Sequence, residues 1–574
     1  MPKGPALRIL YDGRQSRYKA PTGCLVPHEL CRVTVSVPIT CGLKRCSLVI
    51  EREDGLSLTV PLTEGEAQGA YQDWHASFSL FAEGLYFYTF RMTTAESTFT
   101  LYRLGEGDTN MEAGEPWQLL VIPADYHVPA DFAGRVMYQI FPDRFAKAGS
   151  PDLADKLTPY WIHADPAEPP VKGPDKDGNW CCDFYGGNLK GVEEKLPYLK
   201  SLGVGVIYLN PIFLAASNHR YDTADYKRLD PMLGTEDDFV SLCAAAHELD
   251  IRILLDGVFS HVGADSRYFD AKHRFGGGAV SDPASPYRSW FTFKHYPDDY
   301  DCWWDVKSLP CVNEMDPAFL DHILWDEDSV VAHWLGLGAD GFRLDVADEL
   351  PDAFIAHLRK RVKALKPDAL VIGEVWEDAS NKCSYGKRRT YFTAGELDGV
   401  MNYPFRKAIL GLVTGELSPG AFADGILTLV DHYPTDALHA SMTFLSTHDT
   451  PRVLTVLKEA VGDKALPAMK AAVALQYFLP GMPSVYYGDE AGMEGGADPD
   501  NRRFFTRGPF SEELTAHYRA MGDLRNQSEA LRRGSIAFET GENTLTVIRT
   551  LGKERRILTL TLDGEPTFTV HKAK

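Results

Sequence analysis

Short β-branched and aromatic runs dominate the first 125 residues, and no long helical period interrupts them. Turn residues separate the runs at intervals of about ten residues. The runs are CRVTVSV (31–37), CSLVIE (46–51), LSLTV (56–60), GLYFYTFRM (84–92) and STFTLYRL (97–104). Short strands at this spacing are typical of a β-sandwich. The pattern therefore predicts an N-terminal β-sandwich over residues 1–125.

The hydrophobic pattern changes near residue 136, where short apolar runs begin to alternate with longer amphipathic stretches. Eight such runs follow one another: 136–142, 203–211, 251–258, 341–346, 370–375, 399–404, 441–447 and 484–490. Eight strands, each followed by a helix, predict a (β/α)8 TIM barrel of the α/β class over residues 126–510. A doubly wound sheet gives a similar string of elements, so the pattern alone leaves both architectures open.

Two further segments complete the predicted organisation. The third and fourth runs are about 80 residues apart, which is too long for one connection, so we expect a small subdomain at 262–320 inserted after strand 3. After residue 511 a helical stretch precedes the runs IAFET, TLTVIRT and RRILTLTL. The segment 511–574 is therefore predicted to hold the last barrel helix and a short C-terminal β domain.

Charge and cysteine content narrow the class of partners. Lys and Arg total 59 and Asp and Glu total 80, a net charge of −21. Nucleic acid and anionic membrane surfaces repel such a chain, so neither is an expected partner. The ten cysteines are scattered, and the N-terminus lacks the apolar stretch of a signal peptide. We expect a cytoplasmic protein with reduced thiols and no transmembrane helix.

Charged and polar side chains cluster where the predicted strands end, which is where barrel enzymes place their chemistry. The third run is followed by Asp256 and His261, the fourth carries Arg343 and Asp345, and the fifth ends at Glu374. The seventh run ends at His448 and Asp449. The set therefore marks the carboxyl end of the barrel as the candidate site.

Arg343 and Asp345 point to the same side of a strand, because alternate residues share a face. The guanidinium is expected to lower the pKa of Asp345, whereas the apolar surroundings of Glu374 are expected to raise its pKa. Neighbouring strands lie about 4.8 Å apart, close to the ~5–5.5 Å between the two carboxyls of a retaining glycosidase. An ordinary buried ion pair for Arg343 and Asp345, and a strand-end salt bridge for Glu374, are the structural alternatives.

These motifs resemble the α-amylase family of glycoside hydrolases (family 13). Four short regions of that family occur in order as DGVFSH, GFRLDVADE, EVW and FLSTHD, and LPCVN (309–313) resembles a fifth. The runs YQIFPDRF, FYGGNLKGV, SNHRYDTADY, MNYPFR and DPDNRR resemble in particular the group of neopullulanases, cyclomaltodextrinases and maltogenic amylases. The resemblance spans about residues 136–510, with matching order and spacing.

The resemblance implies roles for individual residues. Asp345 matches the nucleophile, Glu374 the general acid/base, and Asp449 the third carboxylate, which binds sugar hydroxyls. The other matched positions are substrate-binding: His219, Tyr221, Asp256, His261, Arg343, Trp376, His448, Asp498 and Arg502. The implied reaction is hydrolysis of α-1,4 bonds, with α-1,6 bonds as a second class, in maltodextrins, cyclodextrins or pullulan. The resemblance also implies that the N-terminal sandwich is carbohydrate-binding-like, and in this group that domain often helps to form a homodimer.

Departures from the family pattern leave three questions open. Ser260 and Asn188 replace residues that hold calcium in some relatives, so no metal site is expected and the chemistry needs no cofactor. Glu377 and LPCVN differ from relatives on the acceptor side, which leaves the choice between hydrolysis and transglycosylation open. A non-catalytic glucan-binding relative is a third alternative, but such relatives usually lose one of the three carboxylates.

Overall fold

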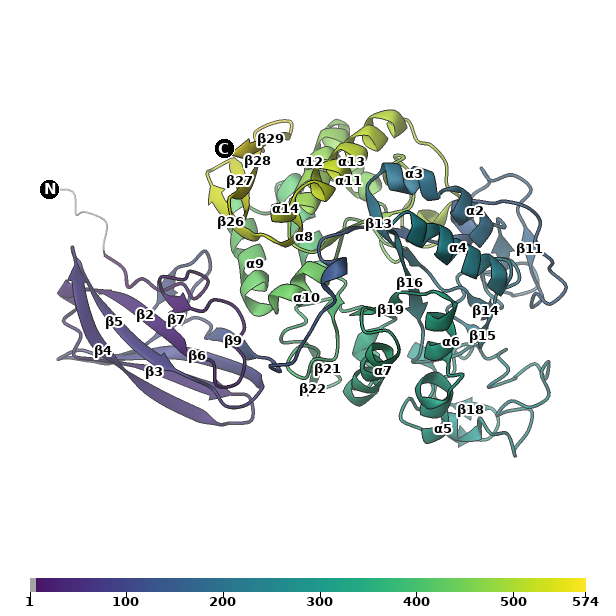
Figure 1. Cartoon of the computed structure of the whole chain (residues 1–574), viewed down its shortest axis with the longest axis horizontal. Coiled ribbons are helices and arrows are strands. Elements are labelled where there is room, and N and C mark those ends of the chain that lie inside the picture. Colours follow the sequence, from purple (N-terminus) through teal and green to yellow (C-terminus); the bar gives the residue numbers. More distant parts are fainter. Residues whose placement is uncertain (1–6, 574) are drawn as a thin grey trace.

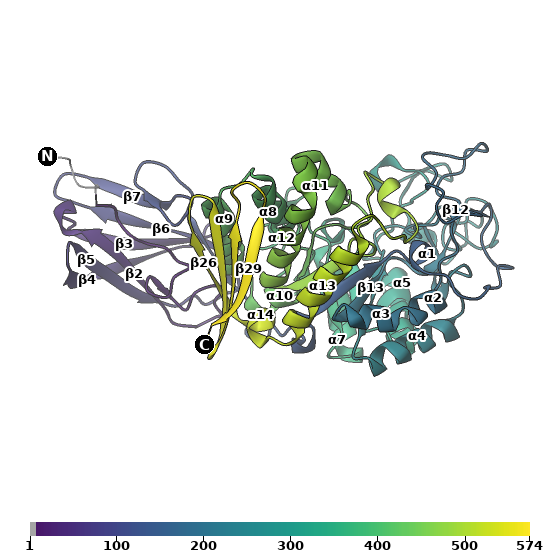
Figure 2. The same cartoon turned by 90° about the horizontal axis from the view of Figure 1, so that it is seen from above.

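The N-terminal β domain lies at one end of the molecule and the barrel at the other (Figure 1). The computed structural model describes residues 7–573. Seen from above, the C-terminal strands β26 and β29 lie between the N-terminal strands and the barrel helices α12 and α13 (Figure 2).

Nine antiparallel strands build the N-terminal domain: β1 (Lys19–Ala20), β2 (Cys31–Pro38), β3 (Arg45–Arg52), β4 (Ser57–Gln68), β5 (Tyr71–Phe78), β6 (Gly84–Thr93), β7 (Thr98–Arg103), β8 (Thr109–Asn110) and β9 (Trp117–Val121). The first half of β4 pairs with β3 and its second half pairs with β5, with a bulge between Glu64 and Ala67. Side chains of both layers, including Val35 and Phe90, share one buried core. The predicted N-terminal sandwich is thus confirmed.

Eight parallel strands form the central barrel: β10 (Val136–Ile140), β13 (Val204–Leu209), β16 (Arg252–Gly257), β19 (Gly341–Leu344), β20 (Leu370–Gly373), β23 (Gly399–Val400), β24 (Met442–Phe444) and β25 (Met482–Tyr486). β10 pairs with both β13 and β25. A parallel bridge between Met401 and Met442 closes the ring. The predicted TIM barrel is confirmed, and closure excludes the open doubly wound sheet.

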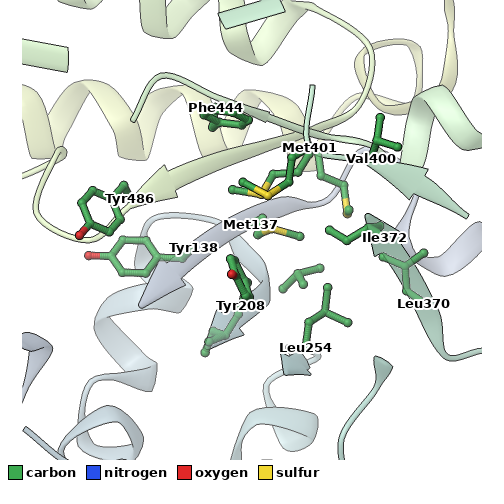
Figure 3. Packing of buried hydrophobic residues seen from close by; sticks show 14 of the residues in the cluster. Met137, Tyr138, Tyr208, Leu254, Leu370, Ile372, Val400, Met401, Phe444 and Tyr486 are labelled. Atoms are coloured by element: carbon green, nitrogen blue, oxygen red, sulfur yellow. The ribbon is translucent and has the colours of Figure 1, made fainter. Parts of the chain in front are cut away.

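The barrel strands are buried on both faces, which explains why their sequences are continuous apolar runs rather than alternating ones. Figure 3 shows Met137, Tyr208, Ile372 and Met401 gathered between the strands. All four side chains are fully buried. Such layers fill the interior of the barrel, so its floor is a packed core and only its rim can hold a ligand.

Helices cover the outside of the barrel: α2 (Leu189–Glu194), α3 (Leu196–Ser201), α4 (Glu236–Glu248), α6 (Val330–Leu337), α7 (Asp352–Leu365), α8 (Tyr403–Thr414), α9 (Pro419–His432), α10 (Thr435–Ala440), α11 (Val453–Val461), α12 (Ala465–Phe478), α13 (Ser511–Asn526) and α14 (Glu529–Arg533). Their starts follow local rules. Thr235 and Asp238 form a reciprocal capping box at α4, and Asn402 caps α8.

Several small elements were not predicted. The loops at the carboxyl end of the barrel contain α1 (Pro142–Phe145), α5 (Pro317–Leu320) and four two-stranded ladders: β11 (Trp161–Ile162) with β12 (Asp183–Phe184), β14 (Phe213–Ala215) with β15 (Thr223–Leu229), β17 (Phe293–His295) with β18 (Asp299–Tyr300), and β21 (Cys383–Ser384) with β22 (Lys387–Arg388). The C-terminal sheet has β26 (Ser535–Thr540), β27 (Thr544–Leu551), β28 (Glu554–Thr561) and an unpredicted fourth strand, β29 (Thr567–Ala573).

The N-terminal domain is anchored to the barrel by polar contacts. Arg14 pairs with Asp424 on α9 at 2.6 Å. The buried Gln118 of β9 donates to Ser380 Oγ at 2.8 Å and accepts from Asn381 Nδ2 at 2.8 Å. Ser380 and Asn381 begin the segment that leads to the β21–β22 hairpin, so this domain touches a loop of the barrel rim.

Among residues 7–573, no helix is both long and apolar enough to cross a membrane. Each of the ten cysteines has a free thiol. The burial of Cys243 raises the pKa of its thiol to about 12, so this thiol is unreactive.

Candidate active site

The predicted site residues emerge from the carboxyl ends of neighbouring strands. Asp256 lies on β16 and Arg343 opposite it on β19, where the two are paired in register. Asp345 follows β19 directly, and Glu374 follows β20 directly. The ladders continue through both, because the N–H of Asp345 donates to Gly257 O and that of Glu374 to Leu344 O. Rigid strand backbone therefore places three carboxyls and one guanidinium side by side.

A cavity of about 800 Å³ opens at this end of the barrel. Ten of the twelve predicted residues line it: His219, Tyr221, His261, Asp345, Glu374, Trp376, His448, Asp449, Asp498 and Arg502. The other two, Asp256 and Arg343, lie beneath its floor and are buried. The structure thus brings all twelve together, ten as cavity wall and two as support.

Arg343 lies beneath the cavity floor and contacts three carboxyl groups. Its Nη1 donates to Asp256 Oδ1 at 2.7 Å and to Asp345 Oδ1 at 2.8 Å, and its Nη2 donates to Glu374 Oε2 at 2.6 Å. The guanidinium also lies over the ring of Tyr208, 5.8 Å from its centroid. Because the fork of donors is planar and rigid, it fixes the two cavity carboxyls relative to each other.

Burial dominates the electrostatics of these acids. Burial raises the pKa of Asp345 well above its ordinary value, although Arg343 acts in the opposite direction. The pKa values of Glu374 and Asp449 are raised for the same reason. Desolvation therefore exceeds the lowering effect of Arg343 that we expected at Asp345. Acids crowded around one cation interact strongly, so they titrate as one cluster rather than as independent groups.

Glu374 receives donors on both oxygens. Arg343 and the backbone N–H of Val346 donate to Oε2, the latter at 3.0 Å, and Trp376 Nε1 donates to Oε1 at 3.1 Å. Val346 adopts a left-handed backbone with φ +39°. A β-branched residue is strained in that region, and strain of this kind concentrates at functional sites. Here the conformation turns the N–H toward the carboxylate.

The opposite wall of the cavity is a neutral hydrogen-bonded network. Gln139 donates to Nδ1 of His448 at 2.9 Å, which leaves the proton of the imidazole on Nε2. That nitrogen lies 2.5 Å from the Tyr221 hydroxyl and 3.1 Å from Asp449 Oδ2. Burial lowers the pKa of His448 well below its ordinary value. His448 is therefore a neutral donor, and its ring stacks parallel to Tyr221 at 5.4 Å.

Two further histidines are also neutral. Burial lowers the pKa of His219 to about 3 and that of His261 to about 4. His261 Nδ1 lies 3.0 Å from Ser260 Oγ, and its buried Nε2 has no protein partner within the described residues. A buried polar atom without a partner at a cavity wall is suited to a hydroxylated ligand.

Arg502 connects the remaining predicted acids. Its Nη2 lies 3.5 Å from Asp449 Oδ1, and its Nη1 lies 3.2 Å from Asp498 Oδ1. Its Nε donates to the backbone oxygen of His448 at 2.9 Å. Arg502 thereby ties the segment after β25 to the segment after β24.

Several supporting residues escaped sequence reasoning. Tyr208 donates to Asp256 at 2.6 Å, Gln139 orients His448, and Asn210 donates to the Tyr221 hydroxyl at 2.9 Å. All three are polar positions within otherwise apolar strand runs or directly after them. That signal was present in the sequence, because a buried polar side chain needs a partner. Glu349 also lines the cavity, but it lies in a segment without a periodic pattern.

A closed (β/α)8 barrel with paired carboxyls at its strand ends is the architecture of a barrel glycoside hydrolase. Residues 139–530 match the family described as "Alpha amylase, catalytic domain". The chain belongs to the α-amylase family of glycoside hydrolases, as its motifs predicted.

Individual relatives agree with this assignment. The chain is 35% identical to a cyclomaltodextrinase of Geobacillus thermopakistaniensis over 443 residues, 75% of this chain and 69% of the relative. It is 35% identical to an amylopullulanase of Thermoanaerobacter thermohydrosulfuricus over 494 residues and spans 32% of that longer protein. The solved type III pullulan hydrolase of Thermococcus kodakarensis shares its fold with a TM-score of 0.65 and 26% identity, over 96% of this chain and 94% of that one.

Removing the shared guanidinium is expected to destabilise the fold in a pH-dependent way. Arg343→Gln leaves three buried carboxyls without their cation, which typically costs about 3–5 kcal/mol of unfolding free energy. Without Arg343 the carboxyl pKa values of the folded state rise further above those of the unfolded chain. Stability therefore falls as pH increases, and the loss is larger at pH 8 than at pH 5. Urea denaturation at both pH values measures it.

Arg388→Gln is the matched control. Arg388 is partly exposed and pairs with Glu53, so its loss is expected to cost less than about 1 kcal/mol at either pH. Equal losses for the two variants, or a loss for Arg343→Gln that does not depend on pH, would contradict the assignment of Arg343 as the shared counterion.

Proposed function

We propose that this protein is a retaining α-glucan hydrolase that cleaves α-1,4 bonds, with α-1,6 bonds as a second class, in maltodextrins, cyclodextrins or pullulan. The observation that carries the proposal is the shared guanidinium of Arg343. It holds Asp345 Oδ1 at 2.8 Å and Glu374 Oε2 at 2.6 Å, on two adjacent strands. Carboxyls at neighbouring strand ends can approach the ~5–5.5 Å separation that double displacement needs.

In the first step Asp345 attacks the anomeric carbon and Glu374 gives its proton to the departing glycosidic oxygen. Arg343 holds Asp345 Oδ1, which leaves Oδ2 for the new bond to carbon. Glu374 Oε2 already accepts from Arg343 and Val346, so the proton belongs on Oε1, where Trp376 is the one donor among the described residues. Burial raises the pKa of Glu374, which favours the protonated acid that this step needs.

In the second step water attacks the same carbon and loses a proton to Glu374 Oε1, and the bond to Asp345 breaks. Two inversions at one carbon retain the α-configuration. Asp449 and the neutral donor His448 face the sugar from the opposite wall, where they support binding of its hydroxyls. Tyr221 supplies an aromatic ring beneath the same sugar.

Two alternatives are less well supported. A transglycosylase uses the same two steps with a sugar in place of water, and no feature described above favours a sugar acceptor over water. A non-catalytic glucan-binding protein does not need Asp345, Glu374 and Asp449 converging on one cavity, as they do here.

We propose that no metal takes part. Asn188 and Ser260 stand where some relatives hold calcium, but the Asn188 oxygen already accepts from the N–H groups of Ala148 and Gly191, and Ser260 contacts His261. These residues do not fit a calcium site. Treatment with EDTA is expected to leave both turnover and the melting temperature unchanged, and a loss of either would reveal a metal that the proposal omits.

Replacing the nucleophile is expected to abolish turnover without unfolding the protein. Asp345→Asn keeps an oxygen for Arg343 but cannot form the covalent intermediate, so kcat on maltodextrin should fall by about 10⁴-fold or more. Circular dichroism and the melting temperature should stay close to those of the wild type. Activity within tenfold of the wild type would contradict the role of Asp345.

Product analysis distinguishes the substrate classes. Proton NMR of the first product from maltotriose is expected to show the α-anomer, and an initial β-anomer would contradict retention. Panose from pullulan indicates α-1,4 cleavage, whereas maltotriose indicates α-1,6 cleavage. Absence of hydrolysis on maltotriose, cyclodextrin, pullulan and starch alike would overturn the proposed function.

A further inference from the structure

Two large aromatic side chains at the cavity are unusually exposed. Tyr385 is 77% and Trp304 is 73% exposed, the highest values for large apolar or aromatic side chains within residues 7–573. Tyr385 lies at the tip of the β21–β22 hairpin, and Trp304 lies in the segment between β18 and α5. Both line the active-site cavity although they are distant in sequence.

One carboxylate oxygen holds both rings. Trp304 Nε1 donates to Glu349 Oε1 at 2.6 Å, and the Tyr385 hydroxyl donates to the same oxygen at 3.1 Å. These bonds use only the polar edge of each ring. The ring faces consequently remain available for contact, although water would otherwise favour their burial.

The backbone conformations of Trp304 and Tyr385 are strained. Trp304 has φ +47° and Tyr385 has φ +49°, both in the left-handed region. For residues other than glycine such conformations are strained, and they cluster at active sites and ligand sites. Neither side chain offsets the strain by packing into the core, because both are mostly exposed. A ligand that covers the rings is the explanation that fits both observations.

The hairpin beneath Tyr385 is held from two directions. On the barrel side Ser384 Oγ donates to Asp348 O at 2.8 Å and Lys382 pairs with Asp348 at 3.0 Å. On the other side Arg388 pairs with Glu53 of the N-terminal domain at 2.6 Å. The ring of Tyr385 is therefore positioned before any ligand binds, which reduces the entropy lost on binding.

We propose that Trp304 and Tyr385 form a platform for a remote sugar of the glucan, and that Glu349 is the positioning residue for both rings. This inference rests on the proposed function, in which Asp345 and Glu374 act on a sugar bound in the same cavity. Apolar sugar faces stack on such rings, and the platform selects long or cyclic glucans over short ones.

Substrates of two lengths test the platform. For Trp304→Ala and Glu349→Ala, the ratio of kcat/KM for maltoheptaose to that for maltotriose is expected to fall about five- to tenfold, mainly through KM. Glu349→Gln keeps an acceptor oxygen and should restore most of the ratio. Tyr385→Phe keeps the ring but loses its hydrogen bond to Glu349, so an intermediate fall of the ratio is expected.

Phe81→Ala is the control, since Phe81 is 70% exposed but lies on the N-terminal domain away from the cavity. A merely structural role for Glu349 would lower the melting temperature and reduce both kcat/KM values equally. That result, or an unchanged ratio in all the platform variants, would overturn the platform. If the wild type hydrolyses neither maltodextrin, the proposed function itself fails, and the two failures are thus distinguishable.

Discussion

The contact between one guanidinium and three carboxyls is the constraint on which the rest of the site depends. Arg343 is fully buried, and Asp256, Asp345 and Glu374 all lie within 2.8 Å of its nitrogens. One cation cannot neutralise three buried anions, so burial raises the pKa of each acid. The three acids therefore titrate as one coupled cluster, and in the proposed mechanism Glu374 carries the proton while Asp345 is ionised.

The barrel supplies the rigidity that this arrangement requires. Asp256 and Arg343 are paired in register, and the acids of the cavity follow the last residues of β19 and β20. By contrast, the rings proposed to select the substrate lie on loops, where Trp304 and Tyr385 adopt left-handed backbones. Chemistry and specificity thus reside in different parts of the fold, because a reacting group tolerates less displacement than a sugar platform does.

Sequence patterns predicted the regular parts of the molecule. Parallel strands are buried on both faces, so their apolar runs are conspicuous, and all eight were found in order. Strands of two or three residues, such as β11, β17 and β21, are too short to show a period, and they were missed. The residues at strand ends followed from the barrel, whereas the meeting of Trp304 and Tyr385 at Glu349 depends on loop geometry that no local pattern encodes.

The pKa of Asp345 was expected to be lowered, but in the folded protein it is raised. A neighbouring arginine lowers the pKa of an acid, and it does so here, but the larger effect is desolvation by every element that encloses the cavity. Burial is a property of the whole fold and leaves no mark two residues away in the sequence. The same desolvation strengthens the attraction between Asp345, Asp449 and the positive charge that develops on the sugar in the proposed transition state. The closed barrel therefore contributes to the proposed chemistry by excluding water as well as by placing the acids.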